Sequence, residues 1–136
     1  MTILLVGILA VTALPQLPDQ SAFDARGFHD GTLSLLRYGQ KSAIAQRRAV
    51  CVGFTASSAI LTIASVAGSS NCDTHMMGPN GDSPATITAK SGTRYVGTPA
   101  DFRFDGLGRA SSAQTIQVVG ASNAIKIEAE TGYVHE

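Results

Sequence analysis

The sequence has no tryptophan, and aromatic residues make up only 6% of its 136 positions. Charged residues are also scarce, at 15%, and 10 Lys and Arg residues balance 10 Asp and Glu residues. Charge repulsion therefore does not keep this chain unfolded, and a broad basic surface for nucleic acid is not expected. The length fits one ordinary domain, and the 14 glycines favour a turn-rich domain that contains β-strands.

The longest apolar run is shorter than a membrane span. Residues 1–18 carry no charge, but Pro15 and Pro18 interrupt the run before the roughly 20 residues that a spanning helix needs. A secretory signal peptide is an alternative, with Val11-Thr12-Ala13 as its cleavage site, although no basic region precedes the run. A buried core helix is a further alternative, but a domain of this size cannot surround an all-apolar helix.

Residues 21–48 have helical periodicity, with apolar residues at spacings of three and four and basic residues between them. We expect one amphipathic helix, capped by Ser21 and irregular near Gly27 and Gly31. Its basic excess indicates either a solvated face or an interface with an acidic neighbouring subunit. The apolar positions are Phe23, Phe28, Leu33, Leu36, Ala43 and Ile44, and the basic ones are Arg26, Arg37, Lys41, Arg47 and Arg48.

After residue 48 the periodicity becomes that of β-strands. Residues 49–55 and 59–65 predict a hairpin joined by Ser57 and Ser58. Residues 68–84 predict a loop that is too polar to belong to the core. Further short strands are expected at residues 85–89, 101–105, 115–119 and 124–129. The sequence therefore predicts an α+β fold whose antiparallel sheets pack on the helix.

No pattern in the sequence indicates an enzyme. A nucleophile elbow, a phosphate-binding loop and a His-Glu-x-x-His pair are all missing, and His29, His75 and His135 are scattered along the chain. We therefore expect no catalytic residues and no cofactor. Basic residues in the strand region are isolated, which favours solvated side chains over a nucleic-acid patch; they are Arg94, Arg103 and Arg109.

One segment offers soft metal ligands. Cys72 and His75 lie three residues apart, Met76 and Met77 follow, and Cys51 is available as a further ligand for copper or zinc. No second ligand pair of the usual spacing accompanies them, so no metal site is expected.

Residues 6–15, Val-Gly-Ile-Leu-Ala-Val-Thr-Ala-Leu-Pro, resemble the second half of the N-terminal helix of type IV pilins and type II secretion pseudopilins. In that family a basic leader, a Gly-Phe processing site with N-methylation, and an acidic residue precede this stretch. The resemblance implies that these elements are encoded upstream of Met1 in a truncated reading of the gene. It also implies that the run packs in the membrane and in the filament through Ile3, Leu4, Leu5, Val6, Ile8, Leu9, Val11, Leu14 and Pro15.

Two further regions resemble the GspH/FimT branch of minor pilins. Residues 35–52 are similar to the segment where that branch's helix enters its first strand. Residues 102–109 are similar to its Phe-Asp-x-x-Gly-Arg turn, and residues 115–118 and 130–134 to its closing strands. Within the branch, the chain is most similar to minor pilins of mannose-sensitive haemagglutinin (MSHA) pili.

The resemblance implies a type IV pilin-like fold in three parts: a hydrophobic helix segment at 1–20, its amphipathic continuation at 21–48, and a globular antiparallel β domain at 49–136. It implies a non-enzymatic subunit that helps to assemble, initiate or cap an adhesive MSHA-like pilus or a type II secretion pseudopilus. Its expected partners are other pilin subunits, the assembly platform and the inner membrane, which a single helix would cross to place the β domain in the periplasm or on the filament surface.

The resemblance also bears on the cysteines and on DNA. Pilin domains lie in an oxidising compartment, which implies a Cys51–Cys72 disulfide; two unpaired thiols are the alternative. The arginine-rich C-terminal motif of DNA-uptake minor pilins is not carried over, because residues 128–136 hold three glutamates and no arginine. A secreted or periplasmic module that binds a ligand through residues 68–84, and a DNA-uptake minor pilin, are the alternative functions.

Overall fold

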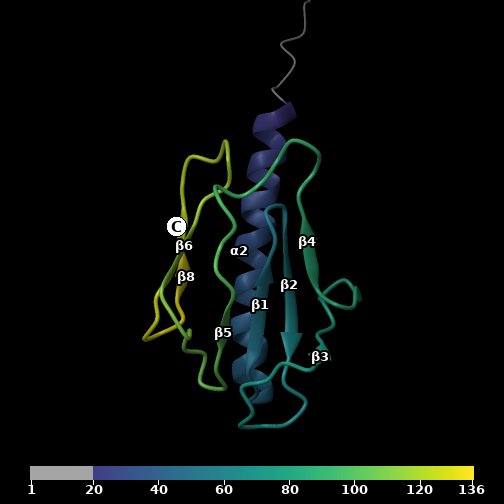
Figure 1. Cartoon of the computed structure of the whole chain (residues 1–136), viewed down its shortest axis with the longest axis vertical. Helices are drawn as coiled ribbons and strands as arrows, with labels where there is room; N and C mark the ends of the chain where they lie inside the picture. Colours follow the sequence, from purple (N-terminus) through teal and green to yellow (C-terminus); the bar gives the residue numbers. More distant parts are fainter. Residues whose placement is uncertain (1–19) are drawn as a thin grey trace, which may run out of the picture.

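The computed structural model describes residues 20–136, so the hydrophobic positions between Ile3 and Pro15 lie outside the described part. The fold is α+β, with one helix followed by antiparallel strands (Figure 1). The elements are α2 (Gln20–Gln46), β1 (Val50–Phe54), β2 (Ser58–Ile63), β3 (Thr74–His75), β4 (Thr86–Thr88), β5 (Phe102–Phe104), β6 (Gln114–Ile116), β7 (Ile125–Ile127) and β8 (Val134–His135).

The helix α2 follows the predicted range closely, but details of its sequence interpretation are wrong. Ser21 is already helical rather than an N-cap, and the helix continues without a break through Gly27 and Gly31. Arg47 ends it by adopting a positive φ of 53°, where the amide of Arg48 donates to the Ala43 carbonyl. Within residues 20–136 no helix has both the length and the apolar character of a membrane span.

The buried face of α2 combines large apolar residues with small ones. Gly39 approaches the sheet so closely that a Cβ there would lie 3.2 Å from the Leu61 side chain. Phe23 and Ile44, predicted for this face, are instead 56% and 48% exposed. Small side chains let the helix approach the strands, so helix and sheet pack tightly. The buried positions are Ala25, Phe28, His29, Thr32, Leu33, Leu35, Leu36, Gly39 and Ala43.

The predicted hairpin is confirmed as β1 and β2, paired from Val50↔Ile63 to Phe54↔Ala59. These strands form the centre of the larger sheet, because β5 pairs with the other edge of β1 while β3 and β4 pair with β2. Residues on one face of each strand are buried against α2 and those on the other face are more exposed, as alternation requires.

Residues 68–84 are less loop-like than predicted. Thr74 and His75 form the short strand β3, which pairs with Ile63 and Thr62 of β2. Met76 follows and is buried, with only 3% of its surface exposed. The polar segment therefore holds one core residue and adds an edge to the larger sheet, so the prediction that it lies wholly outside the core is wrong.

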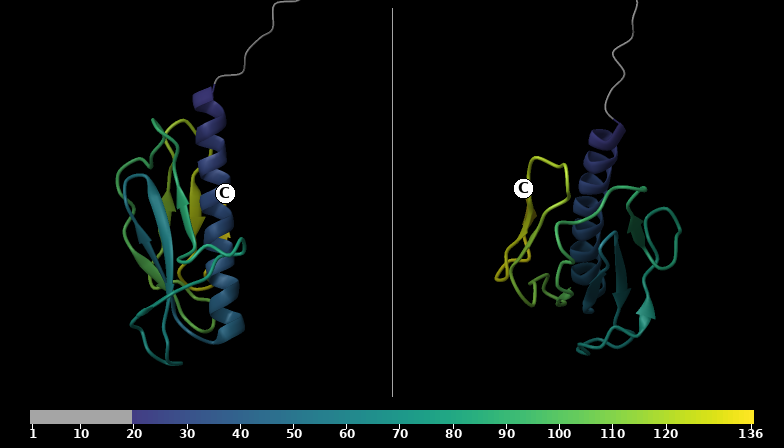
Figure 2. Two further views of the ribbon diagram at one scale, coloured as in Figure 1. Left: turned by 90° about the vertical axis from the view of Figure 1, so that its right-hand side faces the viewer. Right: turned by 45° about the horizontal axis from the view of Figure 1, so that its top comes forward.

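A second sheet has the order β6-β7-β8 and packs beside the first on the same side of the helix. In the left view of Figure 2, most of the strands within residues 20–136 lie to one side of α2. Aromatic rings connect helix and sheet: Phe28 and Tyr95 have ring centroids 4.5 Å apart, and Phe54 contacts both Tyr95 and Phe102.

The segment that resembles the Phe-Asp-x-x-Gly-Arg turn does form a turn, and Asp105 stabilises it. The Asp105 carboxylate accepts hydrogen bonds from the amides of Leu107 and Arg109 and from the Arg109 guanidinium. Desolvation alone would raise the pKa of Asp105. These hydrogen bonds and the positive charge of Arg109 outweigh desolvation, so the pKa is lowered. Gly108 supplies the positive φ of 86° that the turn needs.

Candidate functional site

A pocket of about 500 Å³ lies where the first turns of α2 meet the loop before β7 and the residue that follows β8. Figure 2 places this end of the chain, marked C, beside the middle of α2 in its left view. The lining brings together two parts of the chain that are more than 80 residues apart; it consists of Ala22, Phe23, Arg26, His29, Asp30, Gly120, Ala121, Ser122, Asn123 and Glu136.

His29 is the buried polar residue of this pocket, with a relative exposure of 5%. Its Nε2 lies 3.3 Å from Oε1 of Glu136, whereas its Nδ1 is buried and has no hydrogen-bond partner among the described residues. Sequence reasoning placed His29 on the helix but gave it no role. The signal that could have identified His29 is its position, as a polar residue, among the apolar positions of the helix face.

Glu136 is held in place by a second contact, because Nδ2 of Asn123 donates to its Oε2 over 3.0 Å. The hydrogen bond from Asn123 and that from His29 lower the pKa of Glu136, and the charge of Arg37 adds to the effect. The carboxylate is therefore ionised at neutral pH and has one oxygen directed to the imidazole.

Asp30 completes the group. One ligand atom from each of His29, Asp30 and Glu136 can be chosen so that all three lie within 4.8 Å of one another. Two carboxylates beside an imidazole form a cation-binding donor set. Arg26 also lines the pocket, so its positive charge would repel a bound cation.

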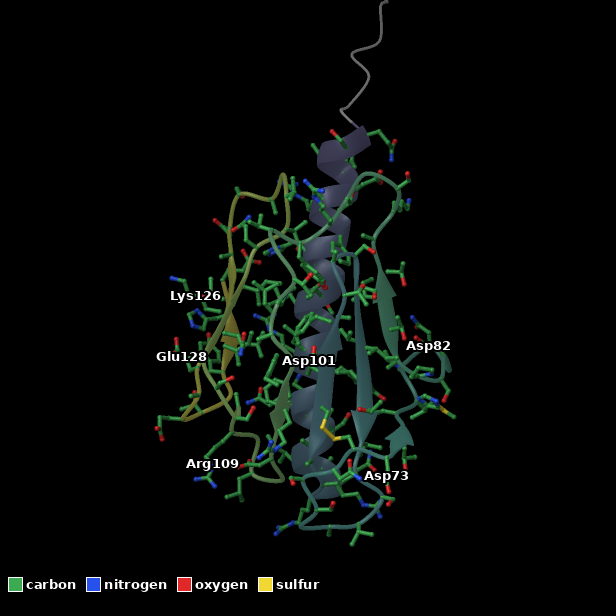
Figure 3. All side chains as sticks on the ribbon, viewed as in Figure 1. Asp73, Asp82, Asp101, Arg109, Lys126 and Glu128 are labelled. Atoms are coloured by element: carbon green, nitrogen blue, oxygen red, sulfur yellow. A yellow bond between two sulfur atoms is a disulfide. The ribbon has the colours of Figure 1, made fainter. Side chains whose placement is uncertain are left out.

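The predicted disulfide is present in the structure. Cys51 of β1 and Cys72 are joined, and the yellow bond is visible in Figure 3 beside the lower part of β1. The alternative of two unpaired thiols is therefore wrong. The bond connects the larger sheet to residues just before β3, where Asp73 accepts hydrogen bonds from the amide and hydroxyl of Ser65. These hydrogen bonds from Ser65 lower the pKa of Asp73.

The alternative soft-metal set is not assembled. Both sulfurs of Cys51 and Cys72 are in the disulfide, so no thiolate is available as a ligand. Met76 points into the core, while His75 and Met77 are exposed. The interpretation of these residues as a copper or zinc site is wrong.

The isolated arginines of the strand region are dispersed, with different neighbours. Arg109 is paired with Asp105 at 3.1 Å. Arg103 shares a shallow depression of about 390 Å³ with Arg47 and two serines, at the end of α2 opposite the His29 pocket. Arg94 does not line that depression. Figure 3 shows Arg109 at the lower edge of the second sheet, and Lys126 and Glu128 higher on the same sheet.

Comparisons with known proteins give no relative: no family model matches the sequence, and neither a curated protein nor a solved structure matches the chain. The site and the fold therefore have to be interpreted from their own geometry.

Proposed function

We propose that this chain is a minor pilin or pseudopilin, a non-enzymatic subunit that helps to assemble, initiate or cap an MSHA-like type IV pilus or a type II secretion pseudopilus. The observation that carries the proposal is the one-sided packing of α2. In the described part of the chain, both sheets lie mostly to one side of the helix (Figure 2), and the helix keeps a stripe of exposed residues along its length.

The exposed stripe suits packing against neighbouring helices in a filament. Lys41 is an exposed basic residue of the helix, whereas the exposed Arg26 and Arg37 lie toward the second sheet, where Arg26 lines the His29 pocket and Arg37 donates to the Val134 carbonyl. Phe23 and Ile44 are exposed apolar residues at the two ends of the helix. A surface that mixes apolar and basic side chains suits an interface with an acidic neighbour.

The sequence that precedes α2 supports the same proposal. Residues 1–18 contain no charged side chain, and α2 follows directly from Gln20. In the proposed mechanism this segment is held in the inner membrane until assembly replaces its lipid contacts with helix–helix contacts, which depend on van der Waals packing. The disulfide fits the oxidising periplasm that the proposal assigns to the β domain.

Gene deletion with complementation tests the proposal. Deletion should reduce the number of surface filaments or the secretion that the pseudopilus supports. The full chain should restore it, whereas a piece starting at Ser21 should not, because it lacks the segment proposed to dock. Full rescue by the piece from Ser21 would favour the secreted binding module instead.

A pair of point variants separates docking from folding. Leu9→Lys places a charge within the apolar run, and Gln16→Lys places the same charge just beyond it. Burying an ammonium group among apolar helices is strongly unfavourable, so Leu9→Lys should abolish complementation while Gln16→Lys retains it. Equal complementation by both variants would contradict the proposal.

A further inference from the structure

We infer that His29, Asp30 and Glu136 form a binding site for a divalent transition-metal cation of the zinc class. This inference does not depend on a role in a filament. It is carried by the convergence of three metal-ligating side chains on one pocket and by the burial of the histidine among them.

The spacing of the ligand atoms fits a tetrahedral ion. Zinc binds imidazole nitrogen at about 2.0–2.1 Å and carboxylate oxygen at about 2.0–2.2 Å, so two ligand atoms of one tetrahedral ion lie about 3.4 Å apart. Nε2 of His29 and Oε1 of Glu136 are 3.3 Å apart in the structure. Asp30 is exposed, and one of its carboxylate oxygens lies within 4.8 Å of the ligand atoms of His29 and Glu136. Water in the open pocket would supply the fourth ligand.

The burial of His29 is an independent observation that points to a ligand. Its side chain is only 6% exposed, yet Nδ1 has no partner among the described residues. A buried ring nitrogen without a partner is unfavourable, and one hydrogen bond from Nε2 to Glu136 offsets only part of the free energy lost when the histidine is buried. Nδ1 lacks a partner whether Nε2 donates to Glu136 or ligates an ion. This cost therefore does not oppose metal binding.

The groups around the ligands favour a defined geometry. Asn123 donates to Oε2 of Glu136 and so orients Oε1 toward His29. Hydrogen bonds to ligand side chains orient them in the same way in known metal sites. The two carboxylates carry negative charge, and the positive charges near them are Arg26 in the pocket lining and Arg37 near Glu136. The divalent ion compensates the carboxylates more closely than either guanidinium does.

The donor set selects among cations. Imidazole nitrogen suits zinc and other transition metals, whereas calcium and magnesium prefer sites built from oxygen alone.

Calorimetric titration of the full chain with Zn²⁺ tests the inference. We expect one ion per chain. His29→Gln and Glu136→Gln each remove a ligand while keeping similar size, and each should weaken binding by about 100-fold or more. Asn123→Ala removes the hydrogen bond that orients Glu136 and should weaken Zn²⁺ binding by about 10- to 100-fold. Amide NMR spectra would verify that each variant is folded.

His75→Gln is the matched control. His75 is an exposed histidine of β3 and, in the described part of the chain, belongs to no group of three ligands. This variant should bind Zn²⁺ as the natural sequence does. In the NMR spectrum of the His75→Gln chain, Zn²⁺ should shift the Nε2 resonance of His29.

Three results would overturn the inference. The first is no Zn²⁺ binding at millimolar concentration. The second is Zn²⁺ binding that Glu136→Gln leaves unchanged, a result that does not depend on whether His29→Gln folds. The third is binding of Mg²⁺ or Ca²⁺ as tight as that of Zn²⁺, which would indicate an oxygen site that makes no use of His29.

Discussion

Thr32 and Tyr95 share a buried hydrogen bond, with Oγ1 and Oη 2.8 Å apart, that ties the helix α2 to the segment between β4 and β5. Oγ1 of Thr32 also lies 2.8 Å from the Phe28 carbonyl oxygen, to which it donates. Because a hydroxyl has one proton, Thr32 must accept from Tyr95. The two residues are almost fully buried, so neither hydroxyl can turn to bulk water instead.

This direction of donation predicts unequal effects for two conservative variants. Thr32→Val keeps the volume but leaves the buried Tyr95 hydroxyl without its acceptor, which should lower the free energy of unfolding by about 1–3 kcal/mol. Tyr95→Phe removes the donor, while Thr32 still bonds to Phe28, and should cost about 0.5–1.5 kcal/mol. Urea denaturation followed by circular dichroism measures both. A larger loss for Tyr95→Phe would contradict the assigned direction.

Tyr95 also predicts how stability changes in alkali. Burial raises the pKa of Tyr95 to about 12, against 10.0 for an exposed tyrosine. The folded state therefore holds this proton more tightly than the unfolded state. Its stabilising effect is complete below about pH 10 and is lost as the pH rises to about 12.

The Tyr95→Phe variant isolates this effect, because it lacks the ionisable group and keeps the ring. Between about pH 10 and about pH 12, the free energy of unfolding should fall more steeply in the natural sequence than in Tyr95→Phe. Parallel pH profiles would mean that Tyr95 ionises in the folded state as readily as in the unfolded state.

Local patterns were sufficient to predict the helix and the central hairpin. The period-two alternation in residues 49–65 matches the observed burial, because β1 and β2 each bury one face. The buried face of α2 was harder to predict, because Gly39 carries no hydrophobic signal while the exposed Phe23 carries a strong one. The strand β3 was missed, because two residues flanked by turns become a strand only through pairing with β2.

The pocket was beyond local patterns altogether. His29 and Glu136 are 136 − 29 = 107 positions apart, and their contact depends on β8 lying beside α2. On the buried face of α2 the sequence has two polar residues, His29 and Thr32, and Glu136 is one glutamate among several. Which glutamate meets the histidine is decided by the path of the second sheet.

Gly132 predicts a strong steric effect within the closing turn. It has a positive φ of 66°, and a Cβ there would overlap the carbonyl oxygen of Gly108 and approach the Gln40 side chain. Gly132→Ala should therefore lower the free energy of unfolding by more than the roughly 1–2 kcal/mol that the left-handed conformation alone costs. Chemical denaturation provides the measurement.

Gly92 is the control for this variant. Its φ of 87° is also positive, but a Cβ there would meet no atom within 4 Å. Gly92→Ala should cost only the conformational part, about 1–2 kcal/mol. Equal losses for both variants would show that the turn at Gly132 relaxes to accept the side chain.

The last prediction concerns the Cys51–Cys72 bond, which closes a loop of 21 residues. A cross-link of this length restricts the unfolded chain and stabilises the folded state by roughly 3 kcal/mol in the chain-entropy description. The variant Cys51→Ala/Cys72→Ala leaves no free thiol and should lose about that much free energy of unfolding. The natural sequence after reduction should lose a similar amount, because it keeps both sulfur atoms and loses only the covalent link. If the reduced chain were as stable as the oxidised one while the double variant were not, the packing of the sulfurs rather than the cross-link would be the source of the stability.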